Sequence, residues 1–395
     1  MSNFSSSRWR TPQLRVAVEG EGIGHASWIE LFFDLVFVNV IAELTHYLSE
    51  HLSLLGFIQF VALFVPCWWA WVLFTFYIDR YDTDDVPHRL LILGGMLTAI
   101  FLAGTVHEAF GSRAVGFVLS YVTIRSFVLL MYLRSVKYVA SAWANLRLYL
   151  ASYVPSTILW VASLWFTDTI RYSLWGIAMA IELAMPIIGS RLLARTPAHP
   201  SHLPERFGLL TLIVLGEAIV SVAVKAESTN LSQTLPLLAA IGGFAIAACL
   251  WWLYFSFLES IVVIRGIRSV HLYNYGHLPI LIGLVTVAVG VERIIAEVSE
   301  PVLAAGTRWA LCGGITLYMS SIIAISLFAC RKRVTILSVV VIIVTLGLAV
   351  FGGLLPPIVL EGVIVAILSI KVRADILRSS STNHHNLSPV ELSDR

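Results

Sequence analysis

Charged side chains are scarce in this chain. Only 13% of its 395 residues are Asp, Glu, Lys or Arg, whereas 58% are apolar. A soluble protein needs about 25% charged residues, so the composition excludes an ordinary soluble domain. Runs of about 20 mostly apolar residues, long enough to cross the hydrocarbon core of a bilayer, recur along the chain. We therefore expect an all-α, polytopic helical membrane protein that lies in a lipid bilayer.

Cysteine is also rare, and the common enzyme motifs are missing. The four cysteines (Cys67, Cys249, Cys312 and Cys330) lie in apolar stretches without a C-x-x-C pair, which is typical of small buried side chains. The chain has no G-x-S-x-G, no H-E-x-x-H and no Walker loop. It also lacks a basic arm interleaved with aromatic residues. We therefore expect no enzymatic activity, no metal, no cofactor and no nucleic-acid partner.

Hydropathy predicts about twelve spans, arranged as two groups of six. The first group occupies residues 28–194 and the second residues 206–377, with a Pro-rich linker at 195–205. Residues 1–27 have no apolar stretch of the signal-peptide kind, so we expect a polar N-terminal tail. Residues 378–395 are polar and rich in serine, and we expect a disordered tail. The predicted spans are 28–48, 54–78, 88–110, 114–133, 146–167, 172–192, 206–226, 235–262, 276–297, 304–328, 334–353 and 355–377.

The positive charges are unevenly distributed between the two predicted sides. Of the 26 Lys and Arg residues, 20 fall in segments on the side of the N-terminal tail. Four fall on the other side, and Arg125 and Arg293 lie within spans. Cytoplasmic segments carry the excess of Lys and Arg, so both termini are expected in the cytoplasm.

Three short segments recur in the same order in the two groups. Residues 29–41 resemble 205–219, residues 67–77 resemble 249–259, and residues 88–95 resemble 277–284. The last match superposes His88 on His277. Six spans separate the copies, which predicts two parallel repeats related by an axis along the membrane normal. A functional path is then expected at the interface between the halves.

The first predicted span carries polar residues on two faces. At 100° per residue, Glu30 and Asp34 share one stripe, and Asn39, Glu43 and His46 lie nearly opposite. A charge at the centre of a span costs roughly 2.5–3.5 kcal/mol on insertion scales. These groups must therefore face protein or water, and we expect the helix to be enclosed rather than peripheral.

Other charges are embedded in later spans, and the acids outnumber the arginines. Arg125 is expected to pair with an acid that the sequence leaves open, and Glu292 and Arg293 to form an interhelical ion pair. The surplus acids, with Glu217 among them, must be protonated or meet a cation. This surplus favours proton or cation traffic over anion traffic.

One hypothesis combines these residues into a single transport site. Asp34 and Glu217 are expected to line or gate a polar path between the halves, at depths that differ by roughly 12 Å. Glu30 would lie at its mouth, with His88 and His277 beside it. Alternatively, each acid separately holds a neighbouring helix in place.

Three segments resemble one known family. "SWIELFFDLVFV" (27–38), "ERFGLLTLIVLGEAIVSV" (205–222) and "YNYGHLPILIGLVTVAVGVE" (273–292) are similar to segments of the bacterial low temperature requirement protein A family. The resemblance covers about residues 25–375. It implies a multi-pass protein of the bacterial inner membrane, named for a growth phenotype in the cold, without a settled biochemical activity. Ala218 stands where that family's motif has serine.

Two classes of function remain open, with a third behind them. The first is a secondary transporter or channel-like permease for a cation, a proton-coupled substrate or a small solute. The second is a scaffold or sensor that transports nothing and acts through its tails. An intramembrane enzyme is the third, without a motif in its favour. The sequence leaves the substrate and the oligomeric state open.

Overall fold

The structure is a computed structural model that describes residues 11–15, 27–196, 199, 202–228, 234–259, 266–328 and 334–386. Long helices make up most of it. They are α1 (Trp28–Glu50), α2 (Leu54–Arg80), α3 (Val86–Val106), α4 (Ala114–Ser135), α5 (Ala142–Ala162), α6 (Asp168–Ile188), α8 (His202–Ser228), α9 (Thr234–Glu259), α10 (Ile267–Glu297), α12 (Gly314–Phe328), α13 (Ile336–Phe351) and α14 (Pro357–Asn386).

Short elements extend or join these helices. They are η1 (Ser163–Trp165), α7 (Ser190–Leu193), α11 (Ala305–Arg308), the π-helical η2 (Trp309–Gly313) and η3 (Gly352–Leu354). Strands β1 (Gln13–Leu14) and β2 (Tyr81–Asp82) form a two-residue antiparallel pair. This pair fastens the segment before α1 to the end of α2.

Nine helices in the described part of the chain are long and apolar enough to cross a membrane. They are α2, α3, α4, α5 with η1, α6, α9, α10, α11–α12 with η2, and α13 with η3. The other long helices are α1, α8 and α14, which contain buried charged residues such as Asp34, Arg206 and Glu361. The chain is therefore a multi-pass helical membrane protein, and a total of twelve spans stays a prediction.

Local signals explain several helix ends. Asp85 caps α3 by accepting a hydrogen bond from the His88 amide, and Ser53 caps α2 in the same way through the Gly56 amide. Proline follows Asp85 within the first turn of α3, where its missing N–H costs nothing. These ends lie close to the predicted ones at residues 54 and 88.

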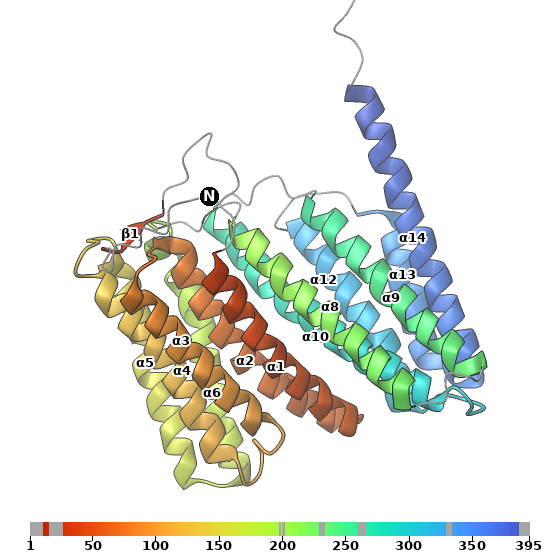
Figure 1. The fold of residues 1–395 in the computed structure, drawn as a ribbon, viewed down its shortest axis with the longest axis horizontal. Helices are drawn as coiled ribbons and strands as arrows, with labels where there is room; N and C mark the ends of the chain where they lie inside the picture. Colours follow the sequence, from red (N-terminus) through yellow and green to blue (C-terminus); the bar gives the residue numbers. More distant parts are fainter. Residues whose placement is uncertain are drawn as a thin grey trace, which may run out of the picture.

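The helices form two neighbouring groups, α1–α6 and α8–α14 (Figure 1). Helices α1 and α2 pack against α8 and α10, so these four helices make the boundary between the groups. Helix α10 is the most enclosed candidate span, with 78% of its most apolar stretch buried. A side chain at Gly283 would come within 2.8 Å of the Gly314 carbonyl oxygen, so glycine permits the close packing of α10 on α12.

Several helices extend beyond the predicted spans. Helix α8 begins at His202, inside the predicted linker, and α10 begins at Ile267, nine residues before the predicted span. His277 therefore lies within α10, ten residues after its first residue. Helix α14 continues to Asn386, beyond the predicted end of the last span at residue 377. Residues 387–395 lie outside the described residues, and the proposed division into domains stays a prediction.

Only one face of α1 is enclosed by the described helices. The stripe with Glu30 and Asp34 is buried. On the opposite stripe, Asn39 and His46 are exposed and Glu43 is half-buried. For the second stripe, the expectation that these polar side chains face protein or water stays a prediction.

Candidate functional site

Five buried charged or titratable side chains join α1 and α2 to the start of α8. We call Glu30, Asp34, Asp79, His202 and Arg206 the charged cluster. Arg206 donates from Nη2 to Asp34 Oδ1 at 2.8 Å, and its Nη1 lies 3.7 Å from Glu30 Oε2. The His202 ring lies between Glu30 (Nε2 to Oε2, 2.9 Å) and Asp79 (Nδ1 to Oδ1, 3.1 Å). None of the five residues is more than 3% exposed.

Helical spacing explains why these groups meet. Glu30 and Asp34 are four residues apart on α1, and His202 and Arg206 are four residues apart on α8, so each pair shares a helix face. Trp71 of α2 completes the contact by donating its indole N–H to Asp34 Oδ1 at 2.8 Å. The Arg206 guanidinium also lies 5.9 Å from the centre of the Trp71 ring.

The charged cluster contains more acids than permanent bases. Three carboxylates face one guanidinium, so protonation of His202 reduces the excess negative charge. Burial alone would lower the pKa of His202, but its contacts with Asp79 and Glu30 raise it. His202 precedes the predicted span 206–226.

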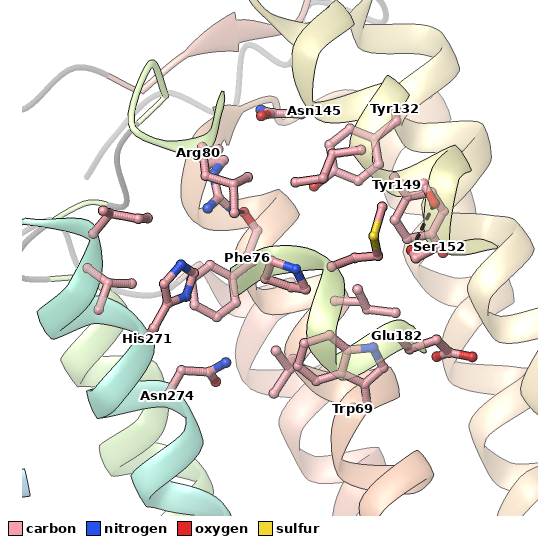
Figure 2. A pocket seen from close by; sticks show the side chains of 18 of the residues that line it. Trp69, Phe76, Arg80, Tyr132, Asn145, Tyr149, Ser152, Glu182, His271 and Asn274 are labelled. Carbon is pink, nitrogen blue, oxygen red and sulfur yellow. Dashed lines mark hydrogen bonds between the residues drawn. The ribbon is translucent and has the colours of Figure 1, made fainter. Parts of the chain in front are cut away.

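A pocket lies beside the charged cluster, between the two groups of helices (Figure 2). The empty space among its lining side chains amounts to about 730 Å³, a value that includes open solvent at the mouth. Helices α2, α4, α5 and α6 line one side, and the first turns of α10 line the other. The labelled lining residues are Trp69, Phe76, Arg80, Tyr132, Asn145, Tyr149, Ser152, Glu182, His271 and Asn274. Polar and aromatic side chains thus face one space from both predicted halves.

The most buried charged groups that line the pocket are Arg125 and Glu182, whose Nη1 and Oε1 atoms lie 2.8 Å apart. Glu182 also accepts hydrogen bonds from the Tyr121 hydroxyl at 2.5 Å and the Trp160 indole at 3.1 Å. The side chains of Arg125 and Glu182 are each 1% exposed. The partner that the sequence left open for Arg125 is therefore Glu182 of α6.

Two residues that line the pocket carry polar atoms without a hydrogen-bond partner among the described residues. Nε2 of His271 and Oδ1 of Asn274 are buried and have no hydrogen-bond partner among the described residues. The described hydrogen bonds of Arg80 go to the carbonyls of Phe76 and Thr196, at 3.0 and 3.1 Å. Burying a polar group without a partner costs free energy, so a polar solute in this space would gain by satisfying these atoms.

The end of α2 connects the pocket with the charged cluster. Asp79 belongs to the cluster, and its Oδ2 accepts a hydrogen bond from the His199 amide at 2.8 Å. The next residue, Arg80, lines the pocket and binds Thr196. Asn145 of the pocket also donates to the Thr196 hydroxyl at 2.9 Å. Both sites thus hold the segment that precedes α8.

The structure does not bring Glu217 to Asp34. Glu217 follows Arg206 by eleven residues on α8, a distance of roughly 16 Å along the axis. It is half-buried. The described contact of Arg293 is with the Ser49 carbonyl of α1, and not with a carboxylate.

The two predicted histidines lie in aromatic surroundings. His88 is buried in the first turn of α3, and its ring centre lies 6.1 Å from that of Tyr77. His277 is hydrogen-bonded to the Tyr254 hydroxyl (3.0 Å) and the Tyr273 carbonyl (2.6 Å). Neither histidine has a described hydrogen bond to Asp34 or Glu217.

Sequence reasoning missed part of both sites. It placed His202 in the linker, counted Arg206 as a loop charge, and passed over Asp79 at a helix end. A usable signal was present, since two acids four apart on one helix matched a histidine and an arginine four apart on another. No comparable signal marked His271 and Asn274, because only the tertiary structure brings them to the pocket.

Two comparisons place the chain among known proteins. A family model described as bacterial low temperature requirement A protein (LtrA) matches residues 25–372. An uncharacterized protein of Rhizobium meliloti is 29% identical over 317 residues, which cover 72% of this chain and 76% of that protein.

Proposed function

The chain belongs to the bacterial low temperature requirement A family, and we propose that it is a secondary transporter or channel-like permease of the bacterial inner membrane. The proposal includes twelve spans in two parallel six-helix repeats, with both termini in the cytoplasm. It includes no enzymatic step. The transported species is a small polar solute, with a proton or another cation as the coupling ion.

The pocket carries this proposal. It lies between the two groups of helices, where duplicated transporters bind their substrates, and it takes lining residues from both. Buried polar atoms of His271 and Asn274 point to a ligand that forms hydrogen bonds. Aromatic residues such as Trp69 and Tyr149 supply apolar surface beside them, which is the usual composition of a small-molecule site.

The charges of the pocket favour a neutral or anionic solute over a cation. Arg80 and Arg125 line it together with one acid, Glu182, which already pairs with Arg125. A free cation would therefore meet a net positive charge. The carboxylates of the charged cluster do not line the pocket, and they suit the coupling ion better than the solute.

Packing within the two groups supports the proposed repeats. In the first group α1 packs on α3 and α3 on α4, and in the second α8 packs on α10 and α10 on α12. Gly94 and Gly283, which the sequence superposes, occupy corresponding contacts. A side chain at Gly94 would collide with Phe127 of α4, and one at Gly283 would collide with the backbone of α12.

Uptake into liposomes tests the proposal. Purified full-length protein would be reconstituted with a pH-sensitive dye inside, and a panel of carboxylates, amino acids, sugars and K⁺ would be added under a pH gradient. We expect uptake of at least one neutral or anionic solute, reduced at least tenfold by Asn274→Leu. Asn39→Leu provides the matched control, because Asn39 lies on an exposed face of α1 away from the pocket.

The alternative functions predict different results. A scaffold or sensor would show no flux above empty liposomes for any member of the panel. If Asn274→Leu and Asn39→Leu reduce the flux equally, the solute does not bind in the pocket, and this assignment of the site is overturned.

A further inference from the structure

We infer that the far ends of α1 and α3 form a binding site for a divalent transition-metal ion of the Zn²⁺ class. The ligands are His46 and Glu50 of α1 and His107, which follows α3 directly. One donor atom from each of the three residues lies within 4.8 Å of the others. The sequence predicts no metal because His107 is more than fifty residues away from the other two.

The geometry suits a metal with little adjustment. His46 Nε2 lies 3.6 Å from Glu50 Oε1, and His107 Nε2 lies 2.9 Å from Glu50 Oε2. Ligands of a tetrahedral zinc ion, at about 2.0–2.2 Å from the metal, are separated by about 3.4 Å from one another. The two imidazole rings lie 5.3 Å apart, centre to centre. A small rotation of the surface side chains would bring all three donors onto one ion.

The chemistry of the donors also fits. Two imidazoles and one carboxylate form a known zinc ligand set, with a fourth position for water. With neutral histidines this set carries one negative charge, which attracts a cation. The side chains of His46, Glu50 and His107 are 62%, 43% and 38% exposed, so an ion can enter from solvent. Arg293, the nearby cation, is held by the Ser49 carbonyl.

The site would act as a clip between two helices. It lies at the end of α1 that is opposite to the charged cluster, and the predicted topology places this end outside the cytoplasm. A bound ion would join α1 to α3 and thereby fix the helix that carries Glu30 and Asp34. The direct contacts of Glu50 with the two histidines are the alternative, and they need no metal.

Calorimetry with ZnCl₂ distinguishes a metal site from direct contacts of Glu50 with the two histidines. Full-length protein without a polyhistidine tag would be stripped with EDTA, exchanged into detergent buffer and titrated. We expect one Zn²⁺ per chain and a higher unfolding temperature with Zn²⁺. His46→Ala, Glu50→Gln and His107→Ala should each weaken binding at least tenfold and remove most of the shift in unfolding temperature.

Glu108→Gln is the matched control. Glu108 is an exposed carboxylate beside His107, and its described side-chain contact is with Ser112. This variant should bind Zn²⁺ as the wild type does. The inference is overturned by a wild type that binds no Zn²⁺, or by binding that persists unchanged in the three ligand variants.

Discussion

Arg206 of α8 donates a hydrogen bond of 2.8 Å to Asp34 of α1, and neither residue is more than 2% exposed. The pair crosses the boundary between the two groups of helices. Burial removes both charges from water, and their mutual attraction only offsets that cost. Loss of one partner therefore leaves an uncompensated buried charge, which is far more harmful than loss of both.

Arg206→Met should lower the free energy of unfolding by about 3–5 kcal/mol, because it leaves Asp34 buried without its cation. The double variant Arg206→Met/Asp34→Leu should recover much of this loss. Unfolding by denaturant in detergent micelles measures both. Arg89→Gln is the control: Arg89 pairs with Asp84 at the surface, and such a pair contributes about 0–1 kcal/mol. Equal losses in the Arg206 and Arg89 variants would contradict the prediction.

Glu361, unlike Asp34, is a buried acid without a described partner. It is 1% exposed, and neither carboxylate oxygen has a hydrogen-bond partner among the described residues. A side chain at Gly242 of α9 would come within 2.7 Å of its carboxyl carbon, so the acid is packed tightly against that helix. Replacing an unsatisfied buried polar group with an apolar one of similar size removes a desolvation cost.

Glu361→Met should therefore raise the free energy of unfolding by about 1–3 kcal/mol. The same denaturation experiment measures it. Glu182→Met is the contrasting variant, since Glu182 is equally buried but pairs with Arg125, and its replacement should destabilise. If both variants destabilise the protein, Glu361 has a partner that this packing does not reveal.

The sequence alone predicts the class of fold well and its sites only in part. Long apolar runs dictate membrane helices because each must satisfy its own backbone hydrogen bonds in lipid. The spacing of Glu30 and Asp34 correctly predicts one buried stripe on α1. Helix ends near water are less certain, because polar residues such as those around His202 occur in both helices and loops.

Pairing between helices is the part that the sequence could not supply. An excess of acids over arginines was evident, but the partner of Arg125 depends on how α4 and α6 pack. The same holds for His107, which reaches Glu50 only through the contact of α3 with α1. Local periodicity fixes which face of a helix a residue occupies, and it leaves open which other helix covers that face.

His202 should make the stability of the protein depend on pH. Its contacts with Asp79 and Glu30 raise its pKa in the folded state, despite burial. The folded state then binds the proton more tightly than the unfolded state, whose histidine pKa is about 6.5. This contribution to stability is fully present below that value and is lost as pH rises through the higher pKa of the folded state.

The free energy of unfolding of the wild type should therefore fall as the pH rises above neutrality. It can be measured between about pH 5 and pH 9, a range around the ordinary histidine pKa of about 6.5. His202→Gln should lower stability at acidic pH and flatten this part of the profile. His51→Gln is the control, because His51 lies at the far end of α1 and contacts the Tyr47 carbonyl. A profile that keeps its slope in His202→Gln would assign the effect to other groups.

Asp34 and Glu217 should act independently of each other. Asp34 of α1 is bound by Arg206 of α8, and Glu217 lies roughly 16 Å beyond Arg206 along α8. Substitutions separated by more than about 7–10 Å without shared partners usually add within about 0.3–0.5 kcal/mol. The unfolding free energies of Asp34→Asn, Glu217→Gln and the double variant should therefore be additive. Asp34→Asn combined with Arg206→Met provides the positive control, and this pair should show an interaction energy of about 0.5–3 kcal/mol.

The uptake rates of the same single and double variants provide a second measurement. If Asp34 and Glu217 were successive steps of one transport path, the effect of one substitution on the uptake rate would depend on the other. If Asp34 and Glu217 couple as strongly as Asp34 and Arg206 in either measurement, they share a site that the structure does not bring together.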